Sequence, residues 1–234
     1  MKTKVILLFT ILVIIMEQGT LAQNEKLLSD WANLNRYKKE NSAIELLANN
    51  KNRVVFMGNS ITEGWVRFCP EFFFDNSYVG RGISGQTTPQ MLVRFRQDVV
   101  NLNPKIVVIL AGTNDIAGNT GPSTLEMIED NISSMSEIAK ANNIKVILCS
   151  VLPAFDYPWK PGLKPAEKIV NLNKWIKNYC EENDLIYVDY FTQMADEHNG
   201  LKKEYSEDGV HPNKVGYEVM IPIIEAAIKE ILNK

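Results

Sequence analysis

Ser60, Asp208 and His211 are the residues whose types and spacing best suit nucleophilic chemistry. The chain has two histidines, so an imidazole base has two candidates. His211 follows Asp208 by three residues, and a carboxylate at that spacing could accept the ring N–H and fix the tautomer. The other histidine, His198, lies among polar residues and is expected in a surface loop. An imidazole base activates a serine hydroxyl, which is a weak nucleophile until its proton is removed.

Three stretches of small or polar residues each follow an apolar run. Ser60 comes directly after Met57-Gly58-Asn59, a glycine-rich stretch occupies 80–85, and Ala-Gly-Thr-Asn-Asp occupies 111–115. If the apolar runs are parallel strands, their carboxyl ends meet at one edge of a sheet. A helix beginning after Ser60 would add backbone N–H donors there. Each stretch alone is typical of a plain glycine-rich connection, but together they indicate a catalytic set.

The elements that must position these residues alternate along the chain. Near-continuous Val, Ile and Leu runs predict strands that are buried on both faces, at 53–58, 77–80, 105–112, 145–151 and 185–189. Three- and four-residue apolar spacing predicts helices at 29–49, 89–102, 123–142, 165–183 and 213–232, with Ser123 and Glu126 as a capping box. The order predicts an α/β fold: a flavodoxin-like three-layer α/β/α sandwich around a five-stranded parallel sheet.

The order of these blocks resembles the SGNH (GDSL-like) serine hydrolase family over residues 53–212. The resemblance implies that Ser60 is the nucleophile, His211 its general base and Asp208 the residue that orients the base. It also implies an oxyanion hole made by the backbone N–H groups of Ser60 and Gly82 and the side-chain amide of Asn114. No metal and no cofactor are implied.

Two local details bear on this resemblance. The family usually has Asp before the nucleophile, whereas this chain has Asn59. The α/β-hydrolases share the chain order Ser, Asp, His, but their nucleophile elbow needs Gly two residues after Ser, where this chain has Thr62. The SGNH interpretation is therefore preferred.

Residues 1–22 have the pattern of a secretory signal peptide. Lys2 and Lys4 precede an apolar run at 5–16, and Ala22 precedes the expected cleavage site. The run is shorter than the roughly 20 apolar residues that span a bilayer. We therefore expect a single SGNH hydrolase domain at 23–234, periplasmic or secreted, with no stable membrane insertion after cleavage.

Composition excludes some classes of partner. The net charge is −3 and the pI about 5.6, without runs of Lys or Arg, so neither nucleic acid nor an anionic membrane is expected as partner. The three cysteines, Cys69, Cys149 and Cys180, are too few for a disulfide framework, although one disulfide stays open.

The expected activity is hydrolysis of short-chain acyl esters, O-acetyl groups on carbohydrate above all. An irregular segment at 153–165 holds four prolines and follows the fourth predicted strand. Its Tyr157 and Trp159, with Trp65, are expected to contact a small-molecule or glycan ester. The alternatives are a lysophospholipase, a thioesterase, an enzyme like platelet-activating-factor acetylhydrolase, or a non-catalytic carbohydrate-binding protein. A flavodoxin-like cofactor binder ranks last, because the G-x-G-x-x-G at 80–85 lacks the context of a first βαβ turn.

Overall fold

Five parallel strands form one sheet in the computed structural model, which describes residues 30–46 and 52–233. Neighbouring strands follow the order β2-β1-β3-β4-β5. The strands are β1 (Val54–Gly58), β2 (Tyr78–Gly82), β3 (Ile106–Leu110), β4 (Lys145–Cys149) and β5 (Ile186–Val188). This is the flavodoxin-like order of a doubly wound sheet. The predicted α/β fold with a five-stranded parallel sheet is confirmed.

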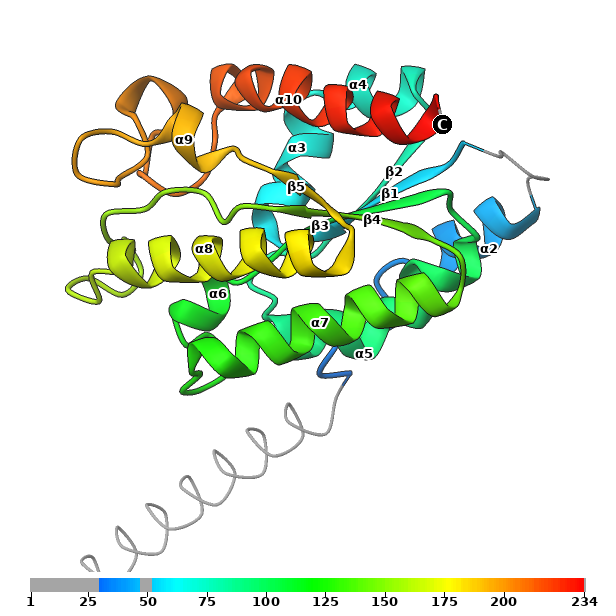
Figure 1. Ribbon diagram of the computed structural model, residues 1–234, viewed down its shortest axis with the longest axis horizontal. Coiled ribbons are helices and arrows are strands. Elements are labelled where there is room, and N and C mark those ends of the chain that lie inside the picture. The colour runs from blue at the N-terminus through cyan, green and yellow to red at the C-terminus, as the bar shows by residue number, and fades with distance from the viewer. Residues whose placement is uncertain (1–29, 47–51, 234) are drawn as a thin grey trace, which may run out of the picture.

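Helices cover both faces of the sheet (Figure 1). Alternate residues of a strand point to opposite faces, so Val55 and Met57 of β1 pack against α5, α7 and α8, while Val54 and Phe56 pack against α3, α4 and α10. The helices are α2 (Lys38–Leu46), α3 (Ser60–Phe68), α4 (Pro70–Asp75), α5 (Thr88–Asp98), α6 (Thr113–Ile116), α7 (Leu125–Ala141), α8 (Ala166–Asn183), α9 (Phe191–Met194) and α10 (Lys214–Leu232). Two 3-10 turns lie at Val100–Leu102 and Lys203–Tyr205.

Three predicted helix boundaries differ from the structure. The cap of α7 is Thr124, whose hydroxyl accepts from the backbone N of Met127 at 3.3 Å, so the predicted capping box of Ser123 and Glu126 is wrong by one residue. The helix predicted at 89–102 divides into α5 and a 3-10 turn. Of the helix predicted at 29–49, α2 forms the second half, after turns at 31–37.

The irregular segment 153–165 folds around a carboxylate. Asp156 accepts hydrogen bonds from the backbone N–H groups of Tyr157, Gly162 and Lys164, at 2.9, 2.6 and 3.3 Å. Lys160 donates from Nζ to the Ala117 carbonyl at 2.7 Å, which ties the segment to the end of α6. The segment therefore has a fixed shape at the carboxyl edge of the sheet.

The predicted signal peptide at 1–22 lies outside the described residues. Within the described ranges, no helix is both long and apolar enough to cross a bilayer. The three cysteines are buried and unpaired.

Candidate active site

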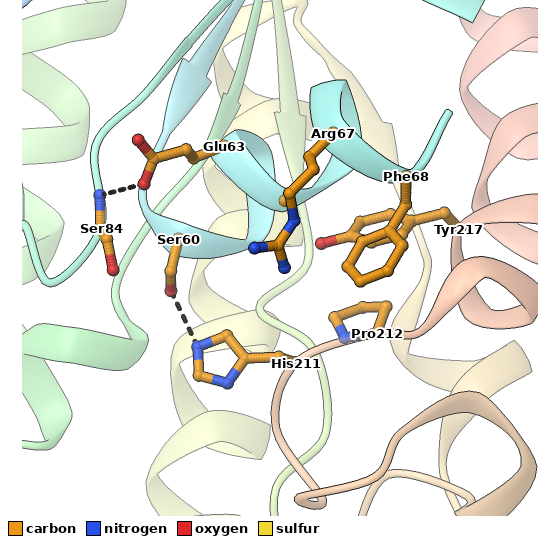
Figure 2. A pocket seen from close by; sticks show the side chains of 9 residues that line it. Ser60, Glu63, Arg67, Phe68, Ser84, His211, Pro212 and Tyr217 are labelled. Atoms are coloured by element: carbon orange, nitrogen blue, oxygen red, sulfur yellow. Dashed lines mark hydrogen bonds between the residues drawn. The ribbon is translucent and has the colours of Figure 1, made fainter. Parts of the chain in front are cut away.

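Ser60 lies where β1 passes directly into α3, at the carboxyl edge of the sheet. The side chain of the preceding residue, Asn59, caps α3 by accepting from the backbone N of Ile61 at 3.0 Å. Asn59 therefore does the capping work that an Asp at this position would do, and α3 begins at Ser60 itself. The Ser60 hydroxyl faces His211, with Oγ 2.9 Å from Nε2 (Figure 2).

His211 and Asp208 lie on the loop between Lys203–Tyr205 and α10. His211 Nδ1 is 2.7 Å from Asp208 Oδ2, and both side chains are a little over one third exposed, 38% and 39%. The other carboxylate oxygen accepts from the backbone N–H groups of Val210 and His211 at 2.9 and 2.8 Å. Partial burial raises the pKa of Asp208, but these hydrogen bonds outweigh it and leave the pKa below its ordinary value. Asp208 therefore stays ionised beside the imidazole at neutral pH.

Ser206 shapes the loop that carries Asp208 and His211, and the sequence analysis missed it. Its buried hydroxyl lies 3.1 Å from Asp208 Oδ1 and 2.8 Å from the His211 carbonyl oxygen, and accepts from the backbone N of Gly209 at 3.0 Å. These contacts fix the turn that carries both groups. The only sequence signal was a Ser two residues before an Asp, which is common in loops.

The candidate oxyanion donors come from the ends of β1, β2 and β3. Gly58 pairs with Gly82 on one side and with Leu110 on the other, so the three strand ends lie level. A Cβ at Gly82 would lie 2.2 Å from the backbone N of Glu63, so only glycine lets the end of β2 approach the first turn of α3.

Asn114 is buried in the first turn of α6, directly after β3. Its side-chain amide donates one N–H to the Gln86 carbonyl oxygen at 2.9 Å. A carboxamide carries two N–H donors. Among the described residues the side-chain amide of Asn114 makes this one hydrogen bond, which leaves it a second N–H donor.

A cavity of about 510 Å³ opens beside Ser60 and His211. Figure 2 shows the Arg67 side chain extending from α3 into this hollow, with the rings of Phe68 and Tyr217 beside it. On the far side, the Glu63 carboxylate accepts from the backbone N of Ser84 at 3.0 Å. The walls of this cavity combine charged and aromatic side chains.

Of the three predicted substrate contacts, the structure places one beside the site. Trp159 is 43% exposed, its ring lies 5.8 Å from that of His211, and it stacks on Tyr157 at 4.9 Å. Tyr157 itself is fully buried, with its hydroxyl 2.8 Å from Thr113 Oγ1. The expectation of a surface role for Tyr157 is therefore wrong.

Trp65 does not reach the surface either. It lies on the buried face of α3, four residues after Ile61, and stacks on Phe72 and Tyr217 with ring centroids 5.3 and 5.6 Å apart. Only 1% of it is exposed. The structure corrects the expectation that Trp65 contacts substrate, because the helical period turns it into the core.

His198 takes no part in the site. Its side chain is 71% exposed, and its ring nitrogen lies 3.8 Å from the Glu197 carboxylate. In the part of the chain that the structure describes, no group of three His, Cys, Asp or Glu side chains is placed to hold a metal ion.

Comparisons with known proteins agree with the fold and the order of these blocks. The profile of the GDSL-like lipase/acylhydrolase family matches residues 56–219, and the chain belongs to this enzyme family. A crystal structure of a GDSL-like lipase from Bacteroides thetaiotaomicron is 51% identical, has a TM-score of 0.83, and aligns over 86% of this chain and 99% of that one.

Two curated relatives carry the name of esterase. Esterase TesA of Pseudomonas aeruginosa is 29% identical in an alignment 181 positions long, which covers 75% of this chain and 83% of that protein. The acetylxylan esterase of Xylanibacter ruminicola is 25% identical in an alignment 213 positions long, which covers 76% of this chain. The chain spans 43% of the length of that acetylxylan esterase.

Proposed function

We propose that this chain is a serine esterase that removes short acyl groups, O-acetyl groups on carbohydrate above all. The observation that carries the proposal is the continuous hydrogen-bonded chain from Ser60 Oγ through His211 to the Asp208 carboxylate, at 2.9 and 2.7 Å. Such a chain can make a neutral hydroxyl nucleophilic, because the imidazole accepts the hydroxyl proton and the carboxylate stabilises the imidazolium.

The proposed reaction has two halves. His211 Nε2 takes the proton from Ser60 Oγ as that oxygen attacks the ester carbonyl, and Asp208 stabilises the imidazolium that forms. The carbonyl oxygen becomes an oxyanion held by the N–H groups of Ser60, Gly82 and Asn114. When the intermediate collapses, the alcohol leaves with the proton from His211 and Ser60 stays acylated. Water, deprotonated by His211, then releases the carboxylic acid and regenerates the serine.

The substrate class is inferred from the walls of the site. Trp159 offers an exposed aromatic face beside His211, and Arg67 and Glu63 line the cavity on the other side of Ser60. Stacking rings combined with charged groups are typical of sugar binding. The names of the relatives, acetylxylan esterase and esterase TesA, fit either a glycan ester or a simple ester. Preference for a lipid or thioester remains an outcome of the test.

We also propose that the mature protein begins at Gln23 after export. The basic, apolar and small residues of 1–22 support this, although they lie outside the described residues. Amino-terminal sequencing of the protein recovered from a periplasmic or secreted fraction tests it. A first residue of Gln23 is expected, whereas an intact Met1 in that fraction would contradict it.

Hydrolysis of aryl esters of increasing acyl length tests the activity. The protein from Gln23 onward is expected to hydrolyse acetyl and propionyl esters, and Ser60→Ala is expected to lose about 10⁴-fold or more of that turnover. Ser84→Ala is the matched control, because Ser84 lines the same cavity and uses its backbone N–H there. Preference for long chains would favour a lipid esterase or thioesterase. Glycan binding without Ser60-dependent turnover would favour a carbohydrate-binding protein.

A further inference from the structure

Arg94 of α5 is fully buried, and it touches neither Ser60 nor His211. Its guanidinium nevertheless donates four hydrogen bonds at the carboxyl edge of the sheet. A guanidinium has five N–H donors in one rigid plane. The partners of Arg94 show what that plane holds in place.

Two of the bonds reach the ends of β1 and β2. Nη2 of Arg94 donates to the Gly58 carbonyl at 3.0 Å and to the Arg81 carbonyl at 2.9 Å. The Arg81 carbonyl belongs to the same planar peptide as the Gly82 N–H, so holding the oxygen also fixes the direction of that N–H. Gly58 is the last residue of β1, two positions before Ser60. One nitrogen of Arg94 therefore sets the spacing between the strand ends that carry two candidate oxyanion donors.

A third bond of Arg94 acts through Gln86 on Asn114, the third candidate oxyanion donor. Arg94 Nε donates to Gln86 Oε1 at 2.6 Å, and the backbone carbonyl of Gln86 accepts from the Asn114 side-chain amide at 2.9 Å. Gln86 is buried and also donates from Nε2 to the Ala32 carbonyl at 2.7 Å. The orientation of the Asn114 amide thus depends on a residue that Arg94 holds.

The fourth bond orients the guanidinium itself. Nη1 of Arg94 lies 2.9 Å from Asp98 Oδ2, and neither side chain is more than 1% exposed. The other oxygen of Asp98 accepts from Asn41 Nδ2 at 2.7 Å. A buried ion pair is weak support for stability, because removing two charges from water offsets their attraction. Its retention here is better explained by the geometry that it imposes.

We propose that Arg94 is a positioning residue for the oxyanion hole, which sets the Ser60, Gly82 and Asn114 donors relative to one another from behind the strand ends. This inference rests on the proposed function, since an oxyanion hole has meaning only if Ser60 attacks an acyl group. It assigns Arg94 no contact with substrate.

Arg94→Lys tests the proposal. Lysine keeps a cation near Asp98 but lacks the planar fork that reaches both strands. We expect kcat for an aryl acetate to fall by about tenfold to a hundredfold, because misplaced donors lose part of the stabilisation of the oxyanion. KM is expected to stay within about twofold. A short alkylboronic acid forms a tetrahedral adduct with Ser60 that occupies the oxyanion hole. Its affinity is therefore expected to fall by about the same factor as kcat.

The matched control is Arg53→Lys. Arg53 is also buried and also donates to a backbone carbonyl, that of Leu102, but at the opposite edge of the same sheet. The Arg53→Lys substitution is expected to lower the melting temperature without changing kcat. An equal loss of kcat in Arg53→Lys would overturn the proposal, because the effect would then be general destabilisation.

Gln86→Met supplies a second variant that keeps the ion pair of Arg94 and Asp98. It removes the Gln86 side-chain bonds to Arg94 and to the Ala32 carbonyl, and leaves the Gln86 backbone carbonyl that accepts from Asn114. We expect kcat to fall about threefold to tenfold. Unchanged kcat in folded Arg94→Lys and Gln86→Met would overturn the inference while the proposed function stands. Absence of Ser60-dependent turnover in the unmodified protein would instead overturn the proposed function and this inference with it.

Discussion

The two halves of the candidate site are built in opposite ways. Asp208 and His211 are over one third exposed, and the bonds among residues 206–211 join positions no more than five apart. On the other half, Asn114 and Arg94 are buried. The bond from Asn114 to Gln86 spans 28 positions and that from Arg94 to Gly58 spans 36, while the bond from Arg94 to Gln86 spans 8. The base is therefore held by a local turn, and the oxyanion donors by the tertiary structure.

This difference predicts that substitutions in the two halves have different effects on activity and stability. On the loop, a change removes chemistry and leaves the fold, because few core contacts depend on it. Behind the strand ends, a change alters both, because buried hydrogen-bonded groups are costly to leave unpaired. The predictions below run from the largest expected effect to the smallest.

Asp208→Asn tests the half of the site that a local turn holds. The amide places an N–H where the carboxylate accepted from His211 Nδ1, so the ring is held in the wrong tautomer. We expect kcat to fall by about 10³- to 10⁴-fold with the melting temperature nearly unchanged. The control is Asp189→Asn, since Asp189 follows β5 and accepts from the backbone N–H and the hydroxyl of Thr192, and this variant should keep full activity. Full activity in Asp208→Asn would reduce Asp208 to a structural residue.

Asn114→Ala tests the half of the site that the tertiary structure holds. Losing one oxyanion donor costs about a hundredfold to a thousandfold in kcat, with little change in KM. Asn173→Ala is the control, because Asn173 is a buried Asn that bonds both the N–H and the carbonyl of Val151, at 2.7 and 2.9 Å, after β4. It should lose stability and keep kcat. Near-normal kcat in folded Asn114→Ala would remove Asn114 from the mechanism.

The same difference explains what the sequence could predict. Apolar runs predicted the five strands and their parallel sheet, and the short spacing of Asp208 and His211 predicted their pairing, because both are local patterns. Arg94 and Asp98 are four positions apart on a helix, a spacing that usually marks a solvated ion pair. Only the packing of α5 shows that this pair is buried and that Arg94 reaches the ends of β1 and β2.

The aromatic residues illustrate the remaining limit. Trp65 follows Ile61 by four positions, so the helical period already favoured a core position, and composition alone was misleading. Tyr157 has no comparable signal, because its burial depends on Thr113, which is 44 residues away. The exposure of Trp159 likewise follows from the shape of the segment at 153–165, which a sequence of prolines does not specify.

Asp115, the buried neighbour of Asn114, gives a test of the buried half of the site through the pH dependence of stability. Desolvation raises its pKa to about 6, although hydrogen bonds from Thr88 oppose the shift. The protonated folded form adds stability that is full below the unfolded pKa of 3.8 and is lost as the pH rises to about 6. Between these values the free energy of unfolding should fall by about 2 kcal/mol more in the unmodified protein than in Asp115→Asn. Urea unfolding at several pH values measures both slopes, and equal slopes would contradict the assignment.

Trp159→Ala is expected to have the smallest effect. Loss of one stacking face should raise KM for an acetylated oligosaccharide by about twofold to tenfold, and leave kcat for a small aryl acetate unchanged. Trp31→Ala is the control, because Trp31 is similarly exposed, at 46%, but its ring does not lie against that of His211 as the Trp159 ring does. Equal KM values for the two variants would remove Trp159 from the binding surface.

The central claim is that Ser60 carries the acyl group during turnover. Quenching the protein with acid during hydrolysis of an aryl acetate, followed by peptide mass spectrometry, tests this directly. We predict one acetyl group on the peptide that contains Ser60, present in Asn114→Ala as well and absent in Ser60→Ala. Turnover that continues in Ser60→Ala, or an acetyl group that forms on another residue at the rate of turnover, would contradict the account.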